Sequence, residues 1–336
     1  MLRIIPPEVI RPLSVKLPLS KSMANRLMVI RFLAGGGSDG EFPDCDDTRI
    51  MHTLIRQLIT LSDSDEFNAG DAGTVFRFMA AVMAVTPGTR LLTGSSRMLQ
   101  RPAGPLVDAL VKLGASIDYT GNHGFPPLKI SGGRLNGGSV TIDSSVSSQF
   151  ISALMLIAPV MKHGLELKLQ GETVSLPYIR LTARLMEENG IRVETELPRI
   201  RIYPGKYRLG TATVEADWSA AAFWYTLVAL MPDSAVTLRG LRQDSAQGDR
   251  AVAVLSEKTG VNSIWTGNEL ILRHLPGGSS EISIGFTRTP DLFPAMVAAC
   301  AGKGYGAEFY GLSTLRIKES DRDRKSTRLN SSHRIR

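Results

Sequence analysis

The chain of 336 residues contains 43% hydrophobic and 21% charged residues, a composition typical of a soluble globular protein with about two domains. No apolar run is long enough to cross a membrane, and the N-terminal residues lack the apolar core and cleavage site of a signal peptide. The only cysteines are Cys45 and Cys300, which argues against a disulfide framework and favours a reducing cytoplasm.

The net charge of +7 is concentrated at one end of the chain. Residues 323–336 hold five Lys or Arg and one Asp, a net of +4, which leaves 34 basic and 31 acidic residues in the first 322. The body of the protein is therefore only mildly basic. This favours a pocket for small anions over a surface for nucleic acid.

Strand-like and helix-like segments alternate along the chain. Hydrophobic spacing predicts strands at 13–17, 139–142 and 214–216, and helices at 22–33, 74–84, 101–114, 147–159, 177–190, 217–230 and 290–302. Gly114 is a natural C-cap, and Asp217 is the candidate N-cap of its helix. The alternation indicates an α/β protein. No repeat stands out in the sequence, although repeated units of similar length remain open.

Small hydroxyl or glycine residues recur where the predicted helices begin, often with a basic residue nearby. The four starts are Ser20-Lys21-Ser22 with Arg26, Gly73-Thr74 with Arg77, Ser147-Ser148-Gln149, and Ser175 ahead of Tyr178. Helix N-termini offer unpaired N–H groups and a positive dipole end, so they bind phosphate and carboxylate. Several such starts in one place would suit substrates that carry more than one anionic group.

Each of these features also has a simpler interpretation. A Ser or Thr at a helix start is most often only a cap, and Arg26 or Arg77 taken alone could be a solvated helix residue. Asp217 is more often an N-cap than a catalyst. The histidines show no metal-ligand spacing, two cysteines are too few for a zinc cluster, and no Gly-x-Ser-x-Gly motif occurs.

Seven motifs in one fixed order resemble the 5-enolpyruvylshikimate-3-phosphate (EPSP) synthase family. The first two, LPLSKSMANR and NAGDAGTVFR, resemble the family's Ser-Lys-Ser-x-x-Asn-Arg and Asn-Ala-Gly-Thr-x-x-Arg segments. The others are RMLQRPAGPLVDALVKLGA, SSVSSQFISALMLIAP, TVSLPYIRLTARLM, TPDLFPAMVAACAGKG and LRIKESDR. The resemblance extends from about residue 12 to Arg322.

The resemblance implies binding of shikimate 3-phosphate, with Ser147, Ser148 and Ser175 on its 3-phosphate. Gln149 would lie between the two substrates, and Tyr178 would pack near the shikimate ring. The full set of implied ligands of this substrate is Lys21, Ser22, Arg26, Ser147, Ser148, Gln149, Ser175, Tyr178, Asp291 and Lys318.

The resemblance also implies a second substrate, phosphoenolpyruvate, held by Lys21, Gly73, Arg101 and Arg322. The implied reaction transfers the enolpyruvyl group to the 5-hydroxyl of shikimate 3-phosphate and releases phosphate. It requires a base near the hydroxyl and an acid near the methylene carbon.

The implied catalytic residues are Asp291, which would receive the hydroxyl proton, Glu319, which would handle the methylene proton, and Lys21. Neither a metal nor an organic cofactor is expected. We also expect a monomer in the cytoplasm, with no nucleic-acid or membrane partner.

The implied fold has two domains built from repeated βαβαββ units, an arrangement described as an inside-out α/β barrel. Residues 12–228 would form one complete domain, and residues 1–11 plus 229–322 would form part of an incomplete second domain. The family sequence continues beyond the last motif, whereas Asp323–His333 resembles a translated sequencing-adapter oligonucleotide. We therefore expect residues 323–336 to be a non-native tail and this chain to have negligible activity.

Four positions depart from the family pattern. Leu19 replaces a glycine, Asp71 an asparagine and Leu176 a lysine, and Thr314 stands near a usual asparagine. Asp71 would weaken anion binding unless its carboxylate is paired.

Two other functions stay open. One is the related transfer of enolpyruvyl to a UDP-sugar, against which the Ser-Lys-Ser and Lys-Glu-Ser-Asp-Arg motifs argue. The other is a non-catalytic basic binding module, suggested by the sequence pI of about 9.5.

Overall fold

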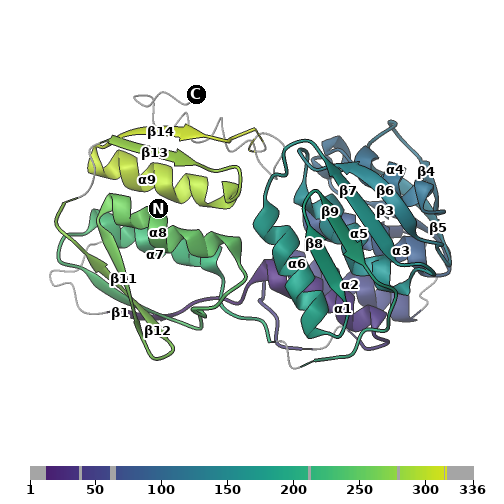
Figure 1. The fold of residues 1–336 in the computed structure, drawn as a ribbon, viewed down its shortest axis with the longest axis horizontal. Coiled ribbons are helices and arrows are strands. Elements are labelled where there is room, and N and C mark those ends of the chain that lie inside the picture. The colour runs from purple at the N-terminus through teal and green to yellow at the C-terminus, as the bar shows by residue number, and fades with distance from the viewer. Residues whose placement is uncertain are drawn as a thin grey trace, which may run out of the picture. The chain divides into compact units, whose positions relative to one another are not determined.

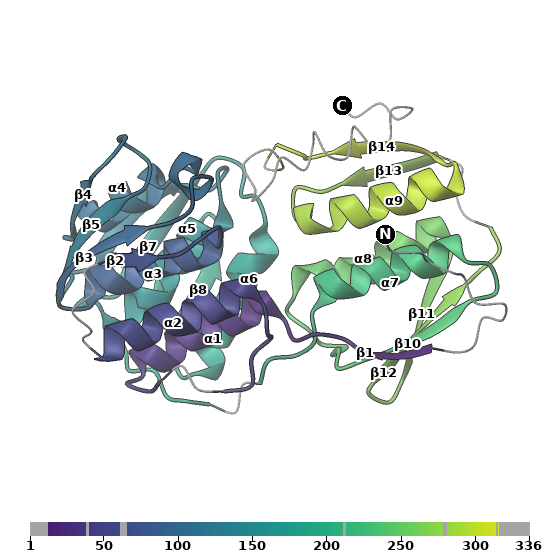
Figure 2. The same ribbon diagram turned by 180° about the vertical axis from the view of Figure 1, so that it is seen from behind.

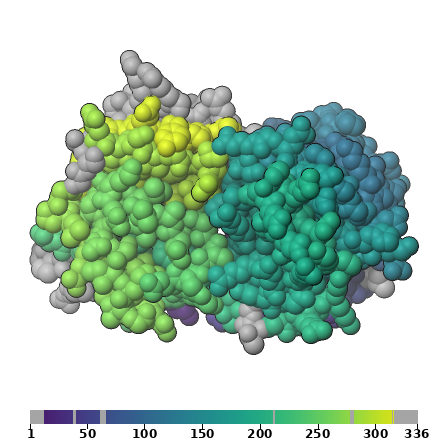
Figure 3. Space-filling model, viewed as in Figure 1, coloured from purple at the N-terminus to yellow at the C-terminus, as the bar shows by residue number. Residues whose placement is uncertain are grey.

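The computed structural model describes residues 13–37, 40–60, 66–210, 213–277, 281–313 and 315. These residues form two units. Unit 1 contains residues 13–19 and 215–312, and unit 2 contains residues 20–214 with 313 and 315. In Figures 1 and 3, unit 1 carries the green-to-yellow C-terminal elements and unit 2 the blue-to-teal ones.

Unit 2 contains two sheets of identical topology, ordered β2-β3-β5-β4 and β6-β7-β9-β8. In each sheet the first two strands are parallel and the other neighbours are antiparallel. Each sheet comes from one strand–helix–strand–helix–strand–strand segment, so the βαβαββ unit expected from the resemblance is present twice. The first segment comprises β2 (Glu66–Asn68), α3 (Gly73–Val85), β3 (Gly88–Thr93), α4 (Gly104–Lys112), β4 (Ser116–Tyr119) and β5 (Leu128–Gly132). The second comprises β6 (Gly138–Asp143), α5 (Ser148–Ile157), β7 (Leu165–Gln170), α6 (Leu176–Glu188), β8 (Val193–Glu196) and β9 (Arg199–Ile202).

Helices α3 and α5 form the centre of unit 2. Every residue of α3 from Val75 to Ala84 is buried, as is every residue of α5 from Phe150 to Ile157. A helix that is apolar on all sides must be covered on all sides. Helix α5 packs against α3, α4 and α6, while α1 (Lys21–Leu33) packs against α2 (Asp46–Thr60) (Figure 2).

Unit 1 repeats the same sheet topology in the order β1-β10-β12-β11, again with one parallel pair and two antiparallel pairs. Residues 20–214 of unit 2 lie in sequence between β1 and α7. A second, two-stranded parallel sheet pairs β13 with β14. The elements are β1 (Leu13–Lys16), α7 (Trp218–Leu230), β10 (Ala235–Arg239), α8 (Val252–Leu255), β11 (Val261–Thr266), β12 (Glu269–His274), β13 (Glu281–Gly285), α9 (Phe293–Lys303) and β14 (Gly306–Tyr310).

All seven predicted helices are present, with shifted starts in two of them. The helix predicted from residue 101 begins at Gly104, after a 3-10 turn at Met98–Gln100. The helix predicted from residue 290 begins with a 3-10 turn, Pro290–Leu292, before α9. Asp217 is confirmed as an N-cap, because its carboxylate accepts hydrogen bonds from the next turn of α7. Gly114, at φ +103°, follows α4 as predicted.

Two predictions about the connections between units differ from the structure. The strand predicted at 214–216 is wrong: the described chain there forms only an isolated bridge, Leu19 to Ala216. The expected boundary at residue 228 also differs from the division at residue 214. The reason is that α7 packs against α9, where the Thr226 hydroxyl donates to the Ala295 carbonyl at 2.9 Å. The predicted tail at 323–336 lies outside the described residues.

Candidate active site

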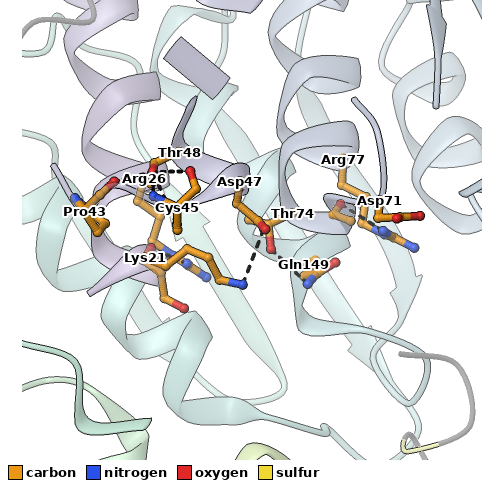
Figure 4. A network of polar contacts seen from close by, with 12 residues as sticks. Lys21, Arg26, Pro43, Cys45, Asp47, Thr48, Asp71, Thr74, Arg77 and Gln149 are labelled. Carbon is orange, nitrogen blue, oxygen red and sulfur yellow. Dashed lines mark hydrogen bonds and ion pairs between the residues drawn. The ribbon is translucent and has the colours of Figure 1, made fainter. Parts of the chain in front are cut away.

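First-turn residues of α1, α2, α3 and α5 lie close together in unit 2 (Figure 4). Gln149, in the first turn of α5, donates through Nε2 to the hydroxyl of Thr74, in the first turn of α3, at 3.0 Å. Arg26 of α1 donates to Thr182 of α6 at 2.7 Å and to Ser152 of α5 at 3.2 Å. These contacts bring the first two turns of α1, α3, α5 and α6 together. Their positive dipole ends therefore combine into a region suited to anions.

Helix α1 begins without a side-chain cap. Ser20 is the N-cap residue, yet its side chain makes no capping hydrogen bond, and its buried hydroxyl has no hydrogen-bond partner among the described residues. No acidic residue lies in the first turn, where Lys21 adds a positive charge. The first N–H groups of α1 are thus left for a ligand.

Arg26 is built into the protein. Besides the hydroxyls of α5 and α6, it donates to the carbonyl oxygens of Ser22 at 2.7 Å and Tyr178 at 3.5 Å. Its guanidinium lies over the rings of Phe78 and Tyr178, and only 2% of the residue is exposed. Burial lowers the pKa of Arg26 to about 10, with the nearby Tyr178 opposing that shift. Arg26 therefore ties α1 to α5 and α6.

Gly73 and Arg101, both predicted as ligands, lie against each other at the start of α3. A Cβ on Gly73 would be 2.4 Å from one terminal nitrogen of Arg101, so a larger residue would displace this guanidinium from its present position. Arg101 also donates to the backbone carbonyl of Asp71 at 3.3 Å. The Asp71 carboxylate accepts a hydrogen bond from the Ser95 hydroxyl, and Arg77 donates to the Gly73 carbonyl at 2.8 Å. These contacts fix the start of α3 beside two cations.

The starts of α5 and α6 supply the predicted serines. Ser147 is the N-cap of α5, and its hydroxyl accepts a hydrogen bond from the Gln149 N–H at 3.2 Å. Ser148 begins that helix and is 6% exposed. Ser175 precedes α6 in the left-handed conformation, at φ +54°, and makes no side-chain capping bond. That conformation costs a serine about 1–2 kcal/mol and is concentrated at functional sites.

A hydrogen-bonded contact holds the loops before α5 and α6 together. The Ser144 hydroxyl donates to the Gln170 carbonyl at 3.0 Å, and the Val174 N–H donates to the Ser144 carbonyl at 3.2 Å. The two loops that carry the predicted phosphate-binding serines therefore lie next to each other.

The remaining predicted residues lie elsewhere. Asp291 belongs to unit 1, half-buried in the 3-10 turn ahead of α9. Lys318, Glu319 and Arg322 lie outside the described residues, so their predicted roles stay predictions. At the position before Pro177, where the family pattern has a lysine, Leu176 is buried with 7% exposed.

The sequence interpretation missed Asp47, whose carboxylate lies 3.5 Å from the Lys21 ammonium (Figure 4). It belongs to α2, which was not predicted. The signal was available: residues 46–60 have apolar side chains at 50, 51, 54, 55 and 58, a helical spacing, with Asp46 and Asp47 in the first turn.

The described part of the chain shows neither a metal-binding cluster nor a membrane-spanning helix. No group of three or more His, Cys, Asp or Glu side chains there is arranged to hold a metal ion. Likewise, none of its helices has the length and hydrophobicity needed to span a membrane.

The fold and the gathered helix starts define an α/β protein built from βαβαββ units, with a site suited to phosphorylated small molecules. The family model for EPSP synthase (3-phosphoshikimate 1-carboxyvinyltransferase) matches residues 12–328. A 3-phosphoshikimate 1-carboxyvinyltransferase of Bacteroides fragilis is 41% identical over 311 residues, which cover 92% of this chain and 75% of the relative. The chain belongs to the EPSP synthase family.

Other relatives agree with this assignment. A protein of the same name from Sulfurovum sp. (strain NBC37-1) is 34% identical over 333 residues, covering 92% of this chain and 77% of that one. A solved structure of EPSP synthase from Acinetobacter baumannii superposes with a TM-score of 0.70 at 23% identity, covering 95% of this chain and 79% of that chain. That likeness supports the two-domain enolpyruvyl transferase fold.

Proposed function

We propose that this chain carries a site for transfer of the enolpyruvyl group of phosphoenolpyruvate to the 5-hydroxyl of shikimate 3-phosphate with release of inorganic phosphate, and we expect negligible turnover from these 336 residues themselves. Family membership supports the reaction type. The observation that carries the proposal is the meeting of four helix starts, those of α1, α3, α5 and α6, beside Lys21 and Arg101. Two phosphorylated substrates require such a collection of N–H donors and cations.

The proposed ligands in unit 2 divide between the two substrates. Ser147, Ser148 and Ser175 would bind the 3-phosphate, because they stand at two adjacent helix starts. Gly73 and Arg101 would hold phosphoenolpyruvate at the start of α3. The remaining proposed ligands in this unit are Lys21 and Gln149 between the two substrates, and Ser22, Arg26 and Tyr178 around shikimate 3-phosphate.

The proposed reaction has two balanced steps. The 5-hydroxyl oxygen bonds to C2 of phosphoenolpyruvate and gives its proton to Asp291, while the methylene carbon takes a proton from Glu319. The C2–O bond to phosphate then breaks, phosphate leaves with the electron pair, the new methyl group returns a proton to Glu319, and Asp291 releases its proton to solvent. Cations beside the departing phosphate stabilise its developing charge. Proton transfer and phosphate departure alone need no redox cofactor.

Calorimetric titration with shikimate 3-phosphate tests the proposal. We expect Ser148→Ala to weaken binding about tenfold or more, because a hydrogen bond to a charged phosphate contributes about 1.5–3 kcal/mol. The matched control is Ser139→Ala, at an exposed position of β6 in the same unit, which should change the affinity less than about twofold. Tighter binding of UDP-N-acetylglucosamine, or no binding of shikimate 3-phosphate, would overturn the proposal.

We also propose that the protein acts as a monomer in the cytoplasm. Both cysteines, Cys45 and Cys300, are free thiols, which supports a reducing compartment. Light scattering at micromolar concentration would check the monomer, and a mass of twice 36.4 kDa would contradict it.

A further inference from the structure

Lys21 is paired with a carboxylate of its own chain. Its ammonium lies 3.5 Å from Asp47, and 44% of the Lys21 side chain and 22% of the Asp47 side chain are exposed. Figure 4 shows the two side chains pointing toward each other from the starts of α1 and α2. The pair lies at the same end of unit 2 as the first turns of α3 and α5.

The direction of Asp47 is set by the start of α2. The Thr48 hydroxyl contacts the carbonyl oxygens of Pro43 and Cys45, the latter at 3.0 Å, and so fixes the first turn. The neighbouring Asp46 points to Arg49 instead, at 3.0 Å, and is 86% exposed. Two adjacent carboxylates in one helical turn therefore have different partners, and of these two it is Asp47 that is directed at the candidate site.

The positively charged Lys21 side chain begins in a region of positive electrostatic potential. It is the first residue of α1, where the dipole end is positive, and the first turn of that helix contains no acidic residue. The starts of α3, α5 and α6 add further positive ends. A lysine with a long flexible stem would leave such a region for solvent unless an anion held it there. In the folded chain, the Asp47 carboxylate is an anion within 3.5 Å of the ammonium.

We propose that Asp47 is the resident counter-ion of Lys21, with which a substrate anion must compete. This inference rests on the proposed function, in which Lys21 contacts both substrates. In the empty site Asp47 keeps the ammonium in place and lowers the net positive charge. When shikimate 3-phosphate binds, its anionic groups share Lys21 with Asp47 and are repelled by the Asp47 carboxylate. The site is therefore restricted to ligands for which the binding free energy from other contacts outweighs the repulsion by Asp47.

The test compares Asp47→Asn with Asp46→Asn in calorimetric titrations with shikimate 3-phosphate. Both variants remove one negative charge from the first turn of α2, but only the first removes the carboxylate that pairs with Lys21. We expect Asp47→Asn to tighten binding about three- to tenfold, the size of one screened charge at several ångströms. Asp46→Asn should stay within about twofold, and Asp47→Glu should resemble the unaltered chain.

Tighter binding of shikimate 3-phosphate by Asp47→Asn would distinguish this role from a structural one, because damage to the start of α2 would weaken binding. Unchanged or weaker binding in Asp47→Asn, or equal tightening in Asp46→Asn, would overturn the proposal. A chain that does not bind shikimate 3-phosphate at all would refute the proposed function instead. In that case the pairing of Lys21 with Asp47 is tested by the rate of Lys21 acetylation, measured by mass spectrometry. If acetylation is no faster in Asp47→Asn than in Asp46→Asn, the inference about Asp47 fails.

Discussion

Asp71 places a carboxylate two residues before α3, where the family usually has an amide. The carboxylate accepts a hydrogen bond from Ser95, while the Asp71 carbonyl accepts one from Arg101. The pairing that the sequence left open is therefore present, but it is with a neutral hydroxyl. A hydroxyl does not cancel the charge, so the carboxylate still opposes an anion at Arg101.

We predict that Asp71→Asn strengthens phosphoenolpyruvate binding about three- to tenfold, because it removes one negative charge near Arg101. Asparagine can still accept the Ser95 hydrogen bond, so the loop should keep its conformation. The measurement is a titration with phosphoenolpyruvate in the presence of saturating shikimate 3-phosphate. Asp118→Asn, at an exposed position of β4, is the control, and weaker binding in Asp71→Asn would contradict the argument.

The resemblance implied ligand roles for Gly73, Arg101 and Arg26, but the sequence did not show that Arg26 also links three helices. A basic residue one turn into a helix can serve either a ligand or the protein. The protein partners of Arg26 include Ser152 and Thr182, which are 126 and 156 residues away in sequence. No local pattern contains that information.

At the level of elements, each sheet depends on close approach between its strands and the helix that covers it. At the end of β5, a Cβ on Gly132 would lie 1.9 Å from the Met83 carbonyl oxygen and 2.1 Å from that of Thr86. Both are backbone atoms that cannot rotate away. A Cβ on the next residue, Gly133, would have no atom within 4 Å.

We predict that Gly132→Ala lowers the free energy of unfolding by at least about 2 kcal/mol, since α3 and β5 must separate to admit the methyl group. Gly133→Ala should change it by less than about 1 kcal/mol. Urea denaturation followed by circular dichroism measures both. Equal free energies of unfolding for the two variants would contradict a close contact between α3 and β5.

The repeated topology of these elements was expected from the resemblance rather than visible in the sequence. The two unit 2 segments share a strand order, yet the sequence alone offered no repeat to assert. A fold constrains which positions are buried more than which apolar residue fills them. Topology is therefore retained where sequence similarity between repeats is lost.

At the scale of the whole molecule, nearly all of described unit 2 is one continuous stretch, residues 20–214, whereas described unit 1 is assembled from the separated segments 13–19 and 215–312. Unit 2 holds two complete four-stranded sheets and helices α1 to α6. Its central helices are covered by elements of the same unit. A continuous chain with its own buried core has what it needs to fold alone.

We predict that residues 20–214, expressed alone, fold with a single cooperative urea transition and retain native-like secondary structure. The segment should elute as a compact monomer in size-exclusion chromatography. Heteronuclear NMR provides the decisive measurement, because a folded segment gives dispersed amide resonances. Collapsed, poorly dispersed spectra would mean that unit 2 depends on residues of unit 1.

The sequence by itself determined the local features: the α/β alternation, the helices, the Asp217 cap, the Gly114 stop and the residue types at four helix starts. Those features follow from short-range preferences that act within one or two turns. Tertiary structure decided which starts meet, that Arg26 binds the protein, that Asp47 faces Lys21 and that α7 belongs with unit 1. Each of these depends on packing between residues far apart in sequence. The burial of apolar surface, and the need of each buried donor for an acceptor, determine which of these residues make contact.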